Sequence, residues 1–160
     1  MKNNEFTIIV DTREQKPWTF EHYHTSHAKL DTGDYSIQGL ETIVGIERKR
    51  NVAEVANNIT ESRFKDVVDR MSQLKHSFIL LEFNLEDVLR YPIGSTVPKR
   101  LWDKIKITPA YLLKHITNLQ LEHNIKVLFC GNSVNAERMA ETILNYVYKQ
   151  NKHLMDNSDV

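Results

Sequence analysis

Residues 77–83, Ser-Phe-Ile-Leu-Leu-Glu-Phe, give the clearest strand signal in the sequence, and residues 125–130, Ile-Lys-Val-Leu-Phe-Cys, give a second. Short runs that are apolar on both faces are typical of strands in the interior of a sheet. Such a sheet needs helices to cover its faces. The two runs therefore predict an α/β fold, in which a central mixed β-sheet is flanked by helices.

The elements around these runs follow from local patterns. A Thr cap followed by Pro at 108–109 predicts the start of a helix. Polar segments at 14–29 and 91–107 are predicted to be loops, the second with one helical turn. Residues 1–150 are interpreted as a single domain and residues 151–160 as a polar, flexible tail. The other predicted strands are 6–10, 35–37 and 42–47, and the predicted helices are 52–74 with a break near 60–62, 108–123 and 135–150.

Composition excludes several classes of protein. The chain has 160 residues, of which 41% are hydrophobic and 26% charged, as in an ordinary globular domain. A single Cys excludes a disulfide framework and a cysteine-based zinc cluster. His22, His24 and His27 lie close together without a fourth ligand, and we interpret them as part of a solvated loop. No apolar stretch is long enough to span a membrane and the N-terminus lacks the apolar core of a secretion signal, so we expect an intracellular protein with no membrane partner.

The zero net charge is a cancellation between two segments. Residues 1–89 carry 11 basic and 15 acidic side chains, whereas residues 90–106 carry five basic side chains and one acidic side chain. A net charge of zero normally counts against nucleic-acid binding. The balance changes if the acidic excess is a metal site, because a bound divalent cation would leave the basic segment without an offset.

Four residues near the ends of the first three strands form a candidate catalytic group: Asp11, Asp34, Glu47 and Lys49. Alternate residues of a strand share a face, so Glu47 and Lys49 project together, and a hairpin would bring Asp34 beside them. Hard carboxylate oxygens suit Mg²⁺, and a nearby lysine can orient the attacking water or stabilise charge on phosphorus. The spacing alone arises often by chance, and Asp11 either completes the same site or builds a second.

Three longer segments around these residues carry a resemblance. They are residues 9–20 (IVDTREQKPWTF), 32–37 (TGDYSI) and 45–50 (GIERKR). In this order and separation, they resemble the nuclease domain of the XPF-type structure-specific DNA endonucleases, a family of the PD-(D/E)xK superfamily. The resemblance covers about residues 7–148 and is greatest to the short, stand-alone members of bacteria and phages. It implies a restriction-endonuclease-like core and a location in the cytoplasm of a bacterium or of a phage-infected cell.

The resemblance also implies roles for individual residues. Asp34 and Glu47 would be the main ligands of Mg²⁺, which Mn²⁺ would replace, with Asp11 supporting the metal and Lys49 as the catalytic lysine. The family usually continues its last motif to an outer Asp, but this position is Ala53, and Glu54 follows it. The residues expected to bind substrate are Arg13, Arg48, Arg50, Lys99, Arg100 and Lys104, and those expected to support the site are Glu14, Gln15, Tyr35 and Glu54.

The implied function is Mg²⁺-dependent hydrolysis of phosphodiester bonds in branched or structured DNA, such as a flap, fork or junction, during repair, recombination or phage DNA processing. The chain has neither the helicase-like region nor the tandem helix-hairpin-helix modules of larger relatives. We therefore expect a homodimer or an accessory DNA-binding, replication or recombination protein. The alternative is a non-catalytic DNA-binding or scaffolding subunit of a nuclease heterodimer. The retained Asp34, Glu47 and Lys49 argue against that alternative, and no Walker A or GxGxxG motif supports a nucleotide-binding protein.

Overall fold

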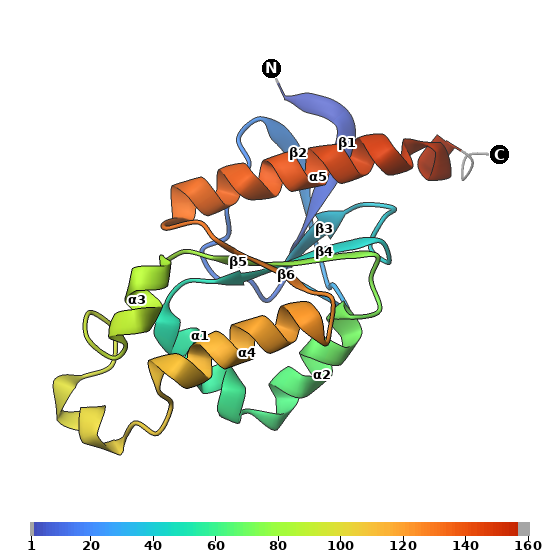
Figure 1. Cartoon of the computed structure of the whole chain (residues 1–160). Helices are drawn as coiled ribbons and strands as arrows, with labels where there is room; N and C mark the ends of the chain where they lie inside the picture. Colours follow the sequence, from blue (N-terminus) through green and yellow to red (C-terminus); the bar gives the residue numbers. More distant parts are fainter. Residues whose placement is uncertain (1, 157–160) are drawn as a thin grey trace.

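The computed structural model describes residues 2–156, and their six strands form one sheet in the order β2-β1-β3-β4-β5-β6 (Figure 1). Strand β3 is antiparallel to both of its neighbours, while the remaining pairs are parallel, so the predicted mixed sheet is confirmed. The strands are β1 (Asn3–Asp11), β2 (Tyr23–Ala28), β3 (Tyr35–Ile37), β4 (Val44–Lys49), β5 (His76–Leu81) and β6 (Lys126–Phe129). The helices are α1 (Val52–Thr60), α2 (Ser62–Met71), α3 (Leu85–Arg90), the 3-10 helix η1 (Lys99–Lys104), α4 (Pro109–Leu121) and α5 (Ser133–Asp156).

Helices cover both faces of the sheet. Helix α5 lies on one face, and α1, α2 and α4 lie on the other (Figure 1). Alternate residues of β5 enter different cores: Leu80 packs in the core beneath α5, whereas Ile79 and Leu81 pack in the core that contains Leu112 of α4. This division explains why residues 77–83 are apolar on both faces, and it confirms the predicted α/β class.

The register of the three central strands brings their acidic ends together. Val10 of β1 pairs with Tyr35 of β3, and Tyr35 pairs with Ile46 of β4. Backbone hydrogen bonds continue this register past β3, because the N–H of Asp11 donates to the carbonyl of Asp34 at 2.9 Å, and the N–H of Asp34 donates to that of Ile46 at 2.7 Å. Asp11, Asp34 and the residue after Ile46 therefore lie side by side at one end of the sheet.

Strand β2 lies inside the segment 14–29, which the sequence predicts to be a loop. It pairs with β1 in parallel at the edge of the sheet, and its side chains are mostly exposed. An edge strand of this kind needs backbone partners but no apolar face, so the hydrophobic pattern gives no signal for it. Helix α3 is a second unpredicted element, and it begins where the Asp87 carboxylate accepts a hydrogen bond from the N–H of Asn84 at 2.8 Å.

Helix α5 is longer than predicted. It continues to Asp156, and Asn151, at the expected start of the tail, is buried and donates its side-chain amide to the carbonyl of Val147 at 2.8 Å. Residues 151–156 therefore belong to the helix, and the rest of the predicted tail, residues 157–160, lies outside the described residues. None of the helices within residues 2–156 combines the length and the apolarity needed to cross a membrane.

Candidate active site

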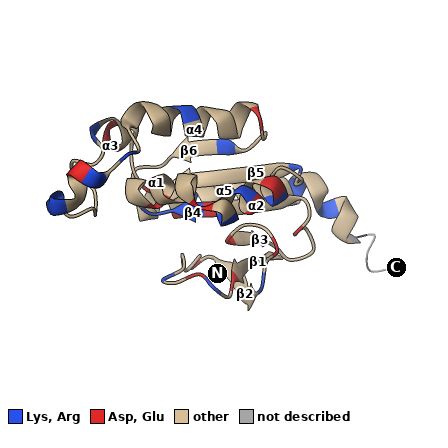
Figure 2. Cartoon of the chain, turned by 90° about the horizontal axis from the view of Figure 1, so that it is seen from below, with Lys and Arg blue, Asp and Glu red and all other residues tan. Residues whose placement is uncertain are grey.

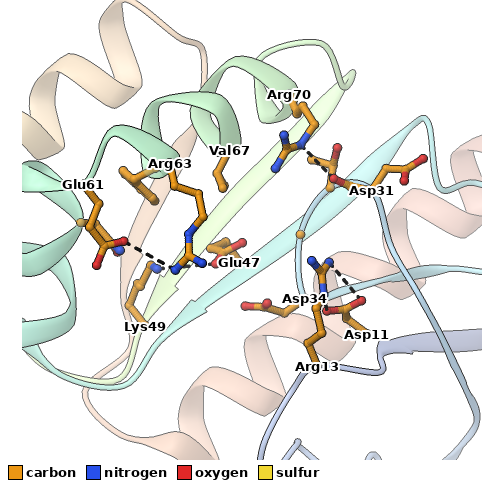
Figure 3. Close-up of a pocket in the computed structure, with 14 residues that line it drawn as sticks. Asp11, Arg13, Asp31, Asp34, Glu47, Lys49, Glu61, Arg63, Val67 and Arg70 are labelled. Carbon is orange, nitrogen blue, oxygen red and sulfur yellow. Dashed lines mark hydrogen bonds and ion pairs between the residues drawn. The ribbon is translucent and has the colours of Figure 1, made fainter.

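The four predicted catalytic residues line one pocket of about 310 Å³ (Figure 3). Its floor is the end of β4, where Glu47 and Lys49 point to the same side of the sheet and their Oε1 and Nζ atoms are 3.5 Å apart. The Lys49 ammonium also lies 5.1 Å from the centre of the Phe64 ring on α2. One wall comes from the end of β1 and the turn before β3, and the opposite wall comes from α1 and α2.

A glycine turn places Asp34 in this pocket. Gly33 has φ +81°, and a Cβ atom there would lie 3.1 Å from the backbone nitrogen of Ile46, so both the conformation and the close approach require glycine. The Asp34 Oδ2 atom accepts a hydrogen bond from the backbone N–H of Arg48 at 2.8 Å. This contact fixes Asp34 against β4 beside Glu47.

The two central carboxyl groups share an environment that disfavours negative charge. Burial, followed by repulsion from Glu47, raises the pKa of Asp34 well above its ordinary value. Burial also raises the pKa of Glu47, although the nearby Lys49 opposes that change. A cation in the pocket would relieve both effects. The two carboxyl groups are therefore better suited to bind a cation than to stabilise the fold without one.

Asp11 reaches the same pocket but already has partners. Its Oδ2 atom accepts from Arg13 Nε at 2.9 Å, and its Oδ1 atom accepts from the backbone N–H of Leu30 at 2.9 Å. Arg13 also donates to the Leu30 carbonyl at 2.9 Å, and its side chain is 65% exposed. In this arrangement Asp11 holds Arg13 at the rim of the pocket, and a direct metal contact by Asp11 stays a prediction.

Arg48 does not lie in the pocket, which corrects its predicted role in substrate binding. It projects from the opposite face of β4, its side chain is only 6% exposed, and its Nε atom donates to Glu82 Oε2 at 2.8 Å. The guanidinium also bonds to the Lys16 carbonyl at 3.0 Å and lies 4.8 Å from the centre of the Trp18 ring. Arg48 therefore ties β4 to β5 and to the loop after β1.

The predicted supporting residues on that face join the same network. The Tyr35 hydroxyl donates to Glu14 Oε2 at 2.7 Å, and burial is the main cause that raises the pKa of Tyr35. Glu14 also lies 3.6 Å from both Arg48 and Arg50, and Arg50 bonds to the Gln15 carbonyl. Arg50, predicted to bind substrate, therefore holds the loop after β1 in place, as do Glu14 and Gln15.

The positions that replace the family's outer Asp lie outside the pocket. Ala53 is 7% exposed and packs in the apolar core beneath α1. The Glu54 carboxylate turns back and accepts from the N–H of Arg50 at 2.6 Å, while the N–H of Glu54 donates to Asn51 Oδ1 at 2.9 Å. Glu54 supports the start of α1 and does not line the pocket, so its position does not match that of the family's outer acid.

Lys99, Arg100 and Lys104 are exposed on η1, in the yellow segment that projects beyond α3 in Figure 1. None of them lines the active-site pocket. In Figure 2, the ribbon segments coloured for basic and acidic residues in this projection lie apart from those around β4 and α2. The predicted contact of these three residues with substrate stays a prediction, and it would be made at a distance from this pocket.

Several charged residues of the pocket carry no motif in the sequence. Asp31 lies on the turn wall, and Glu61, Arg63 and Arg70 lie on the α2 wall (Figure 3). The helical spacing of Arg63 and Arg70, seven residues apart, was the available signal, because residues at that separation share a face of a helix. Glu82, the main partner of Arg48, was also missed, although it lies in the strand signal at 77–83.

The donor set at the floor of the pocket fits a hard divalent cation. Asp34 and Glu47 supply carboxylate oxygens, which are the ligands that Mg²⁺ prefers, and Mg²⁺ normally keeps several waters beside one or two carboxylates. Across residues 2–156, no group of three or more His, Cys, Asp or Glu side chains is arranged to hold a metal ion. A divalent cation at this position would have Asp34 and Glu47 as carboxylate ligands and would leave room for water and substrate as further ligands.

Comparison with known proteins assigns the chain that carries this pocket to a family. The chain matches the family model described as the ERCC4 domain over residues 10–143. No curated protein matches it. Its fold is similar to XPF from Aeropyrum pernix in complex with DNA (TM-score 0.66, 18% identity, covering 91% of this chain and 66% of that one) and to XPF from Aeropyrum pernix (TM-score 0.54, 19% identity, 77% and 52%). The chain thus spans between half and two thirds of those chains. Since the family model covers most of the sequence, including all but the first residue of the three motif segments, the resemblance to XPF-type nucleases is confirmed and the chain belongs to the ERCC4 domain family.

Proposed function

We propose that the protein is a divalent-metal-dependent endonuclease that hydrolyses phosphodiester bonds in branched or otherwise structured DNA. The observation that carries this proposal is the convergence of Asp34, Glu47 and Lys49 in one pocket, with burial raising the pKa of both carboxyl groups. Perturbed carboxyl groups that share a cleft with a lysine are typical of functional sites.

Each of the three residues has a distinct task in this proposal. Asp34 and Glu47 hold Mg²⁺, or Mn²⁺ in its place, and Asp34 is kept in position by the Arg48 N–H. A bound divalent cation would polarise the phosphoryl group and lower the pKa of a coordinated water. Lys49, pairing with Glu47 at 3.5 Å, donates hydrogen bonds to the attacking water or to the phosphate oxygens where negative charge develops. Arg13 contacts a phosphate at the rim.

Two observations support DNA as the substrate. The chain belongs to the ERCC4 domain family, and a structure of similar fold is titled as XPF in complex with DNA. The exposed basic side chains of η1 lie apart from the pocket, which suits a substrate with more than one duplex arm. A homodimer or an accessory DNA-binding, replication or recombination protein would enlarge the contact with DNA.

The alternative function is a non-catalytic DNA-binding or scaffolding subunit of a heterodimer. A subunit that only binds DNA has no need for two buried carboxyl groups whose charges repel each other. The raised pKa values of Asp34 and Glu47 therefore favour the catalytic function.

The deciding experiment is a cleavage panel in Mg²⁺ and in Mn²⁺ on flap, fork, four-way junction, single-stranded and duplex DNA. Asp34→Ala, Glu47→Ala and Lys49→Ala should each abolish cleavage of the preferred substrate, with an unchanged circular dichroism spectrum. The matched control is Asp69→Ala, which removes an exposed acid of α2 outside the pocket. Full activity in any of the three active-site variants would refute the catalytic assignment, and binding without cleavage by the wild type would favour the alternative.

A further inference from the structure

Helix α2 contributes two arginines to the active-site pocket that no motif in the sequence includes. Arg63 and Arg70 are both exposed, line the pocket and point into it (Figure 3). Arg63 lies 3.8 Å from Glu61, and Arg70 Nε donates to the Asp31 carbonyl at 3.0 Å. On the opposite wall the exposed Arg13 faces them across Asp34 and Glu47, so arginines border the carboxylates on two sides.

The two α2 arginines have guanidinium donors to spare. Each guanidinium carries five N–H donors, and an arginine can bind a phosphate with two of them at once. Arg63 is 86% exposed, and its one ion pair within residues 2–156 is a long contact of 3.8 Å with the partly exposed Glu61. Arg48 provides the contrast, because its donors are used by Glu82, by the hydroxyls of Tyr35 and Ser133 and by the Lys16 carbonyl. Arg63 and Arg70 can therefore bind an anion without first breaking a buried network.

Their spacing matches a nucleic-acid strand rather than a single phosphate. Seven residues make two helical turns, so the Cα atoms of Arg63 and Arg70 lie on one face of α2 about 10.5 Å apart along its axis. Val67, one turn from Arg63, lies between them on the same pocket wall. The axial rise of a DNA strand is about 3.4 Å for each nucleotide. Successive phosphates of a strand are farther apart than this rise, because the backbone winds around the helix axis, so the two arginines are far enough apart to contact two different phosphates of one strand.

We propose that Arg63 and Arg70 form a phosphate clamp along α2. The clamp holds the strand that will be cut, and each arginine binds one phosphate, on opposite sides of the phosphate that reaches Asp34, Glu47 and Lys49. The inference rests on the proposed nuclease function and adds the residues that align the strand. The clamp binds substrate through its backbone charge and contributes no proton or nucleophile. Its loss should therefore affect binding more than chemistry.

The test measures DNA binding separately from cleavage. Arg63→Ala and Arg70→Ala are made in an Asp34→Asn background, and the affinity for fluorescein-labelled fork DNA is measured by anisotropy over a salt series. Each arginine variant should bind more weakly and should reduce the slope of log affinity against log salt by about 0.7 to 0.9, the value for one lost phosphate contact. Lys65→Ala is the matched control, because Lys65 is an exposed base of the same helix that does not line this pocket.

Cleavage kinetics with Asp34 intact give a second readout. Arg63→Ala should raise KM several-fold with kcat nearly unchanged, and Arg63→Lys should recover part of the loss, which a purely structural residue would not show. An arginine variant whose salt slope equals that of Lys65→Ala overturns the clamp. If Arg70→Ala disturbs the turn at Asp31, the highly exposed Arg63 decides the test. A wild type that neither binds nor cuts DNA refutes the proposed function itself, whereas a wild type that cuts normally beside unaffected arginine variants refutes only the clamp.

Discussion

Replacing Arg48 with methionine should destabilise the protein and leave the affinity for DNA unchanged. The Arg48 and Glu82 side chains are each 6% exposed, and their Nε and Oε2 atoms are 2.8 Å apart. Removing Arg48 leaves Glu82 buried with the indole N–H of Trp18, at 2.9 Å, as its remaining side-chain donor among the described residues. A buried carboxylate that loses its cation is much less stable than the paired one.

The expected size of this effect is large for a domain of 160 residues. Breaking one side of a buried ion pair costs about 3–5 kcal/mol. With a urea m-value of about 2 kcal/mol/M, the unfolding midpoint should fall by about 1.5–2.5 M. The corresponding fall in Tm is about 6–20 °C, from about 2–4 °C for each kcal/mol in a domain of this size.

Urea unfolding at neutral pH, followed by circular dichroism, measures the effect on Arg48→Met. The double variant Arg48→Met/Glu82→Gln removes the unpaired charge but keeps an oxygen for Trp18, so it should be clearly more stable than Arg48→Met alone. DNA affinity is measured at a temperature where each variant is folded. A variant that unfolds like the wild type but binds DNA several-fold more weakly would refute this reasoning, because Arg48 would then be the substrate contact that the sequence predicted.

Three shorter predictions concern the metal site, the core and the basic projection. Burial raises the pKa of Asp34 in the folded state above its pKa in the unfolded chain. The stability is therefore highest at a pH below both pKa values, where this carboxyl is protonated, and it falls as the pH rises from the unfolded-state pKa through the folded-state pKa. Asp34→Asn should therefore raise Tm by a few degrees at neutral pH in EDTA, and Mg²⁺ should raise Tm only in the wild type; scanning calorimetry between about pH 4 and pH 8 tests both. Ala53→Asp places a carboxyl in an apolar core and should lower stability by about 2–4 kcal/mol in urea unfolding, instead of restoring an outer metal ligand. Charge reversal of Lys99, Arg100 and Lys104 together should weaken binding of forked DNA more than binding of a short duplex, with kcat on the duplex unchanged; equal losses on the two substrates would show that the projection does not contact a second arm.

The sequence predicted the buried parts of the fold better than its edge. Residues 77–83 and 125–130 mark interior strands because burial on two faces imposes an apolar run. Strand β2 could not be found in this way, since the β1 edge fixes its backbone while its own side chains remain in solvent. The end of α5 was also missed, because residues 151–156 are mostly polar in sequence, although Asn151 is buried and Met155 packs against the core beneath the helix.

The candidate site could be predicted only where residues are neighbours on strands. Glu47 and Lys49 were paired by the alternation of side chains along β4, and the same alternation, applied strictly, sends Arg48 to the opposite face. Arg63 and Arg70 were missed because their place at the pocket depends on how α2 turns after the break at Glu61. That break is visible in the sequence, but the direction of the following helix is set by packing of Phe64 against the core.

The neutral net charge is compatible with binding a polyanion, because some acidic side chains are buried whereas several basic side chains at the pocket are exposed. Glu14 and Glu82 are buried against Arg48, so these acids contribute little to the field outside the protein. Arg13 and Arg63 are mostly exposed and stand at the rim of the pocket. The pocket is lined by five acidic and four basic side chains, so a divalent cation at the carboxylates would change the net charge of this lining from −1 to +1. Since counterion release depends on the phosphates actually contacted, the salt dependence of binding should reveal a basic surface that the net charge conceals.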